Sequence, residues 1–225
     1  SEVMVESDAA WIDVHDELNW LDDASRFTWM SERDGWRHLY LVSLDDGATK
    51  QITSGDFDVI ELLKVNETDG IAYFIASPDE ASQRYLYRVN LDGTNLHRVT
   101  PAGVAATHSY KISPDGQWAI HQMSRFDEPP AWNLVSLPDH KDVRTLESNE
   151  ALRKTISSLA RTPTEFFRVT LPPDESDDDQ ASGPLELEAW CMLPPNFDKS
   201  KSYPLLIYVY GEPAGTTVVN RWSSK

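Results

Sequence analysis

The side chains of this sequence that could do chemistry are six histidines, one cysteine and several groups of carboxylates. The histidines show no metal-ligand spacing with one another or with Cys191, so single histidines in strands or turns are favoured. Cys191 falls at an apolar position of an expected strand, which favours a small buried hydrophobe over a thiol nucleophile. No Gly-x-Ser-x-Gly nucleophile motif occurs in the chain. The histidines are His15, His38, His97, His108, His121 and His140.

The carboxylates give two further candidates. The run Asp174–Asp179 could bind a cation, but it lacks the spacing and the glycine of an EF-hand loop. A solvated hairpin loop is the favoured interpretation. Asp16, Glu17 and Glu128 could supply a catalytic carboxylate pair, although no surrounding motif supports one. We therefore predict no metal site and no cofactor.

Composition excludes several classes of protein. The formal net charge of −17 opposes binding to nucleic acid and docking on anionic membranes, because both need clustered Lys and Arg. A hydrophobic content of 40%, with eight Trp and eight Tyr, excludes a disordered protein. No apolar run approaches the roughly 20 residues that span a bilayer. We expect a folded protein whose acidity aids its solubility.

The elements that must position these side chains repeat along the sequence. Leu44, Leu91 and Leu137 occupy equivalent positions 47 and 46 residues apart. Each is the last residue but one of a repeated segment, and Leu86–Leu91 shows the period-2 alternation of a half-buried strand. Turns that combine Asp with Gly or Pro separate the runs. Four short strands per repeat predict propeller blades, with a simple all-β meander as the alternative. The repeated segments are Leu39–Asp45, Leu86–Asp92 and Trp132–Pro138.

We therefore predict a mainly β fold. Residues 1–148 would form the C-terminal part of a β-propeller, with blades at about 18–54, 55–100 and 101–148. Because about three blades cannot close a ring, we expect either an open arc or further blades outside this sequence.

The pattern changes after the third blade. Asn149 is an expected N-cap for a helix over Glu150–Ile156. Strands are expected over Glu165–Leu171 and Leu185–Leu193, and Tyr203–Tyr210 is typical of a buried strand that enters a Gly/Pro turn. Residues 149–225 would thus be a linker and the first strands of another domain.

Two stretches carry a resemblance to a known family. The first stretch is similar to a propeller hairpin of bacterial members of that family, and it reads Ser31-Glu32-Arg33-Asp34-Gly35-Trp36-Arg37-His38-Leu39-Tyr40-Leu41. The second stretch looks like the family's entry into a hydrolase domain. It reads Leu193-Pro194-Pro195-Asn196-Phe197-Asp198-Lys199-Ser200-Lys201-Ser202-Tyr203-Pro204-Leu205-Leu206 and runs into Val209-Tyr210-Gly211. The chain resembles the dipeptidyl peptidase IV branch of the prolyl oligopeptidase-like serine peptidases.

The resemblance implies an eight-bladed propeller on an α/β-hydrolase domain, and the release of N-terminal dipeptides with Pro or Ala at the second position. This segment would supply the last blades, the linker and the first hydrolase strands. The catalytic Ser, Asp and His would lie beyond Lys225, and the amine-binding glutamates before Ser1. The family likeness also suggests a periplasmic or secreted homo-oligomer, and we expect the segment alone to be inactive.

The resemblance assigns one catalytic role. Tyr210 matches the tyrosine of the family's V-Y-[GA]-G-P motif, whose hydroxyl helps to form the oxyanion hole. Glu212 departs from the motif, because the family usually has glycine there. A carboxylate at this position would repel developing negative charge if it pointed inward, or it could point to solvent. The alternative function is a non-catalytic propeller that binds partners.

The hairpin also predicts local contacts. Asp34-Gly35 could fix its turn, and Arg33 and Arg37 could pair with Glu32 or Asp34 across it.

Overall fold

The computed structural model describes residues 3–9, 11–13, 15, 17–21, 24–172, 184–209 and 216–223. The chain divides into two compact units. The first contains Ser1–Met123 with Ala131–Ser148, and the second contains Ser124–Pro130 with Asn149–Lys225. The predicted division into propeller and hydrolase domains at residue 148 stays a prediction.

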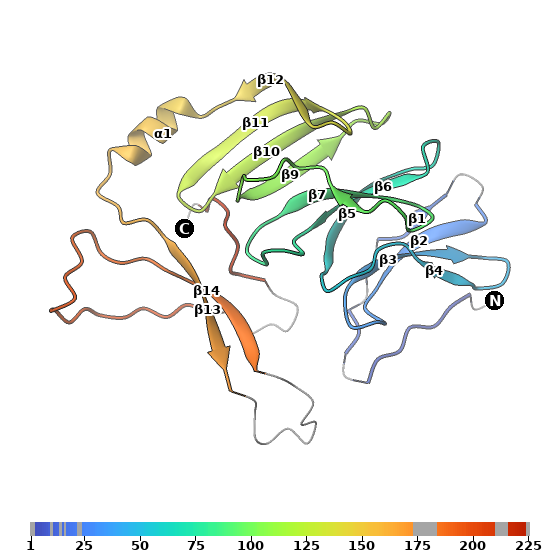
Figure 1. Ribbon diagram of the computed structural model, residues 1–225, viewed down its shortest axis with the longest axis horizontal. Helices are drawn as coiled ribbons and strands as arrows, with labels where there is room; N and C mark the ends of the chain where they lie inside the picture. The colour runs from blue at the N-terminus through green and yellow to red at the C-terminus, as the bar shows by residue number, and fades with distance from the viewer. Residues whose placement is uncertain are drawn as a thin grey trace. The chain divides into compact units, whose positions relative to one another are not determined.

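Three four-stranded sheets, each made of strands consecutive in sequence, confirm the mainly β fold and its propeller-like blades (Figure 1). The strands of blade 1 are β1 (Asn19–Trp20), β2 (Arg26–Ser31), β3 (His38–Ser43) and β4 (Thr49–Gln51). Those of blade 2 are β5 (Val59–Asn66), β6 (Ile71–Ala76), β7 (Tyr85–Asn90) and β8 (His97–Arg98). Those of blade 3 are β9 (Thr107–Ile112), β10 (Trp118–Arg125), β11 (Glu128–Ser136) and β12 (Lys141–Glu147).

Every residue of β6 is buried, because blade 2 is covered on both faces. Successive side chains of a strand point to opposite faces, so β6 contributes to two separate cores. Ala72 and Phe74 join the core that blade 2 shares with blade 1, which we call the first seam. Ile71 and Tyr73 join the core that it shares with blade 3, the second seam. The first seam also includes Met30, Leu39, Ile52, Phe57, Val59, Tyr87 and Val89. The second also includes Ile75, Leu86, Val99, Tyr110, Ala119, Val135 and Leu137.

The repeat seen in the sequence is also a repeat of hydrogen bonds. The backbone amides of Leu44, Leu91 and Leu137 each donate to a carbonyl oxygen across the sheet at 2.8 Å. The acceptors are Ser25, Gly70 and Gln117. Since the backbone amides at equivalent positions make the same bond, the three sheets are copies of one structural unit.

The second unit contains one helix and one hairpin among its described residues. The helix is α1 (Glu150–Ser157), and the hairpin pairs β13 (Glu165–Leu171) with β14 (Leu185–Cys191) in an unbroken antiparallel register. The Phe126 ring packs 5.0 Å from that of Trp190 and 6.1 Å from that of Phe166. These aromatic contacts attach the turn between β10 and β11 to the hairpin.

Three local predictions are wrong in part. Asn149 precedes α1 but makes no side-chain cap bond, because its left-handed backbone turns the amide away and its Nδ2 donates to the Pro130 carbonyl oxygen at 2.9 Å. Residues 203–209 are exposed and are not a strand. A strand needs a hydrogen-bonded neighbour, and no described strand pairs with this segment. Cys191 ends β14 partly exposed rather than buried.

Candidate functional site

The hairpin between β2 and β3 is a tight turn built around an Asp-Gly pair. Gly35 has a φ of 97°, a conformation that glycine adopts without strain. Its amide donates to the Glu32 carbonyl oxygen at 2.9 Å. The Trp36 amide donates to the carboxylate of Asp34 at 3.3 Å, so Asp34 and Gly35 fix the turn as expected.

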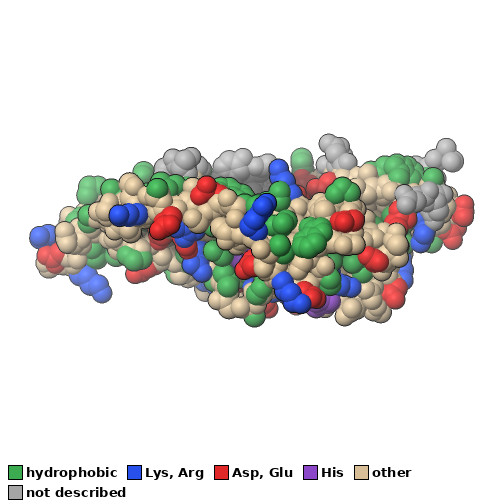
Figure 2. Space-filling view, turned by 90° about the horizontal axis from the view of Figure 1, so that it is seen from above, with side chains coloured by type: hydrophobic (Ala, Val, Ile, Leu, Met, Phe, Trp, Pro, Cys, Tyr) green, Lys and Arg blue, Asp and Glu red, His purple; other side chains and the backbone are tan. Residues whose placement is uncertain are grey.

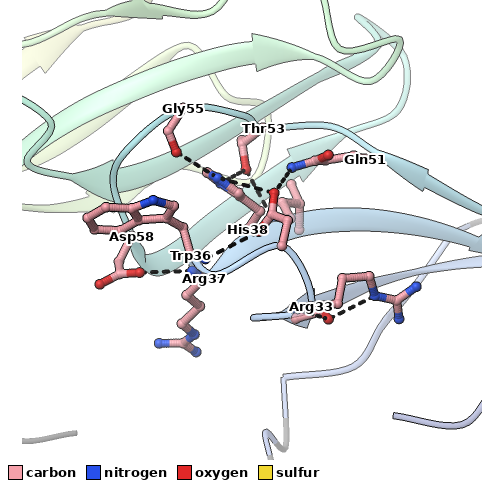
Figure 3. Close-up of polar contacts among 11 residues, drawn as sticks. Arg33, Trp36, Arg37, His38, Gln51, Thr53, Gly55 and Asp58 are labelled. Atoms are coloured by element: carbon pink, nitrogen blue, oxygen red, sulfur yellow. Dashed lines mark hydrogen bonds and ion pairs between the residues drawn. The ribbon is translucent and has the colours of Figure 1, made fainter. Parts of the chain in front are cut away.

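His38, at the start of β3, is fully buried and bonded on both ring nitrogens (Figure 3). Its Nε2 lies 3.0 Å from the Gly55 carbonyl oxygen, which can only accept, so this nitrogen carries a proton. Its Nδ1 lies 3.0 Å from the Thr53 hydroxyl, which also accepts from the Leu39 amide at 2.9 Å. His38 is therefore a structural residue that joins β3 to the crossover after β4.

The arginines of the hairpin do not pair as predicted. Arg33 pairs with Glu6, and Arg37 lies 3.5 Å from Glu17. The Arg37 amide donates to Asp58 at 2.8 Å, as Figure 3 shows. The arginines reach acidic residues of the N-terminal segment rather than acids in the same turn.

A cavity of about 350 Å³ lies beside the end of β2. Its walls include Trp11 and Trp29. The carboxylate of Glu6 lies in this cavity and accepts from Trp29 Nε1 and the Ser31 hydroxyl, each at 3.1 Å, and from Arg33. These three donors hold the carboxylate in place, so its role is to join the N-terminal segment to β2 and the turn that follows it.

Asp127, in the turn between β10 and β11, and Glu128, the first residue of β11, are two partnered acids of the second unit. Glu128 accepts from Arg125 at 2.6 Å and from Arg153 of α1. Burial opposes its ionisation, but the bonds and charges of these arginines outweigh burial and lower the pKa of Glu128. Asp127 accepts from the Thr164 amide at 2.9 Å and from Arg161 at 2.6 Å.

The structure does not test the carboxylate pair that Asp16, Glu17 and Glu128 could supply, because Glu17 and Glu128 belong to different units. Glu17 and Glu128 each have arginine partners, and Asp16 lies outside the described residues. Tyr210 and Glu212 also lie outside them, as does the acidic run Asp174–Asp179. Their predicted roles therefore rest on the sequence alone.

Within the described ranges, no group of three or more His, Cys, Asp or Glu residues could hold a metal ion. No described helix is both long enough and apolar enough to cross a membrane. On the face seen in Figure 2, acidic side chains are interspersed with basic and apolar ones.

The comparison with protein families decides the classification. The sequence model described as "Dipeptidyl peptidase IV (DPP IV) N-terminal region" matches residues 2–130, more than half of the chain. The chain belongs to this family. Over its whole length it is 28% identical to the dipeptidyl peptidase 4 of Trichophyton equinum, of which it covers 28%. Over 87% of its length it is 30% identical to that of Arthroderma otae, of which it covers 24%.

A solved structure gives the same result for the fold. The dipeptidyl peptidase 4 of Porphyromonas gingivalis superposes on 92% of this chain with a TM-score of 0.78 and 28% sequence identity. The superposition uses 27% of that protein. The chain thus spans less than a third of the length of these three relatives.

Sequence reasoning missed one group of buried side chains. His108, His121 and His140 come together in blade 3, although their spacing in sequence follows no ligand pattern. A signal was present in the alternation of β9, which places His108 and Tyr110 on one face of the strand.

Proposed function

We propose that the protein containing this chain is a serine exopeptidase that releases N-terminal dipeptides with Pro, or less often Ala, at the second position. Similarity to proteins named dipeptidyl peptidase 4 over the whole chain is the observation that carries the proposal. The match extends from the blades through the hairpin of β13 and β14. It is therefore not confined to a propeller that an unrelated binding protein could share.

In this proposal the blades limit access to the hydrolase, so that short or unfolded peptides reach it. Tyr210 donates its hydroxyl to the oxygen that becomes negative when a serine attacks the peptide carbonyl. A phenol has a pKa near ~10 and stays protonated at neutral pH, so it can act as this donor.

The replacement Tyr210→Phe tests the role of the hydroxyl in the full-length protein. Loss of one oxyanion donor should lower kcat for a Gly-Pro chromogenic amide by about 10²–10³, with little change in KM. Tyr208→Phe is the matched control, because it removes a hydroxyl two residues away and should leave kcat unchanged. Equal rates for the two variants would refute the assignment.

A substitution of Glu212 gives a second test of the same proposal. If its carboxylate faced the oxyanion at about 8 Å through an effective dielectric near ~40, repulsion of about 1 kcal/mol would slow the reaction roughly fivefold. Glu212→Gln separates the two orientations. A rise in kcat of this size places the carboxylate inward, and an unchanged kcat directs it to solvent.

We also propose that the protein is periplasmic or secreted and forms homo-oligomers, as the family likeness suggests. Cell fractionation and sedimentation of the full-length protein test these two statements. Recovery of a cytoplasmic monomer would contradict both.

A further inference from the structure

Blade 3 contains a group of stacked, buried aromatic side chains that the peptidase proposal does not use. We call His108, His121, His140 and Tyr110 the histidine cluster. His108 is the second residue of β9, His121 lies within β10, and His140 ends the turn between β11 and β12. His108, Tyr110 and His121 are each at most 6% exposed, and His140 is partly buried.

His121 lies at the centre of the cluster and touches the other three rings. Its ring stacks on that of Tyr110 at 4.7 Å and on that of His108 at 5.1 Å, both nearly parallel. The His140 ring meets it edge-on at 4.9 Å. A charge on His121 would therefore be surrounded by side chains rather than by water.

The hydrogen bonds define where the protons of the His108–His121 pair lie. His108 Nε2 lies 3.2 Å from the Val104 carbonyl oxygen, which can only accept, so Nε2 carries a proton. In neutral His108 the other nitrogen, Nδ1, is then an acceptor. It lies 2.8 Å from His121 Nε2, which must donate to it. Protonation of both rings would place two N–H groups against each other, so the pair can hold one extra proton but not two.

The histidine cluster also joins blade 3 to blade 2. The Tyr110 hydroxyl lies 2.8 Å from that of Thr100, which accepts from the Leu86 amide of β7 at 2.8 Å. On its other side the Tyr110 hydroxyl lies 2.8 Å from His140 Nε2. The His108 ring lies 5.5 Å from that of Tyr85, at the start of β7.

The charged groups around the histidine cluster do little to stabilise a protonated histidine. Burial, together with the smaller effects of the neighbouring His108 and His140, lowers the pKa of His121 to about 3. Burial also lowers the pKa of His140, against the opposing charge of Asp142 on β12. Arg98 of β8 adds a positive charge near Tyr110, whose pKa burial raises.

We propose that the histidine cluster is a pH-sensitive latch between blades 2 and 3. When its histidines are neutral, their stacking and hydrogen bonds hold β9 and β10 against blade 2. In mild acid the opened form, in which the histidines are exposed, takes up protons that the closed cluster excludes, so opening of the second seam becomes more favourable. The first seam has no such cluster among its described residues and keeps its packing.

Hydrogen exchange of the full-length protein at pH 7.5 and pH 5.0 tests the latch, with protection factors corrected for the effect of pH on intrinsic exchange. The pKa of His121 is about 3 in the fold and 6.5 when the side chain is exposed. The protection factors of β9 and β10 should therefore fall about 30-fold from pH 7.5 to pH 5.0. Protection of β2 and β3 should change less than threefold. Equal changes in the two blades would overturn the proposal.

His121→Phe should keep the stacking but remove the titration of the central ring, so the difference between the two pH values should become much smaller in blade 3, with the remainder due to His140. If that variant fails to fold, His121→Gln retains an N–H donor for His108 and serves the same purpose. His97→Asn, at an exposed position of β8, is the control and should behave like the wild type. A pH effect of unchanged size in the His121 variants would also overturn the proposal.

Discussion

At the first seam, His38 is bonded within its own blade to Thr53 and to a backbone carbonyl. At the second seam, the histidine cluster bonds and stacks on itself across three parts of blade 3. The two seams share one backbone frame, because Thr53 and Thr100 each accept the amide of an equivalent leucine. The seams differ in the side chains added to the same frame: a single histidine at the first seam and a stacked group of three histidines and a tyrosine at the second.

The largest effect should come from opening a cavity at the first seam. Phe74 is fully buried in β6, so Phe74→Ala should lower the free energy of unfolding by about 3–5 kcal/mol. The loss should be the same at pH 7.5 and pH 5.0, because lost packing does not titrate. Urea unfolding at the two pH values checks this. A loss that depends strongly on pH would remove the contrast between the seams.

The wild-type protein should lose stability between pH 7 and pH 5. The pKa of His121 is lower in the fold than its ordinary 6.5, so the unfolded state binds protons first. Stability is therefore complete above about pH 6.5 and falls as pH decreases toward about 3. At pH 5 the loss from this residue is about 2 kcal/mol. Urea midpoints measured across this range should fall in the wild type and fall much less in His121→Phe.

The matched threonines give a smaller effect. Thr53→Val and Thr100→Val each remove the acceptor of a buried leucine amide and should each lower stability by about 1–3 kcal/mol. Tyr110→Phe should couple to Thr100→Val by about 0.5–1.5 kcal/mol and be additive with Thr53→Val. Two double-mutant cycles measure this difference. Equal coupling in both would mean that the hydroxyl of Tyr110 does not join the blades.

The blades could be predicted from the sequence because their information is local. The spacing of Leu44, Leu91 and Leu137 reflects one hydrogen bond made three times, and the turn residues between the strands repeat with it. The hairpin of β13 and β14 could be predicted for the same reason, since alternating residues and a polar loop between the strands define it.

The contacts that depend on distant partners could not be predicted in this way. Arg33 pairs with Glu6, 27 residues away, rather than with an acid in its own turn. The histidine cluster depends on the register of β9 against β10, which spacing along the chain does not reveal. Tyr203–Tyr210 has the composition of a buried strand, but composition does not supply the neighbour that a strand requires.

The most direct test of the central claim is to identify the product released by the full-length protein from a peptide with proline at its second position. We predict that mass spectrometry will show the N-terminal dipeptide, and that acetylation of the peptide's amino terminus will abolish its release. An intact peptide, or equal cleavage of the acetylated one, would contradict the assignment of this chain to a dipeptide-releasing serine peptidase.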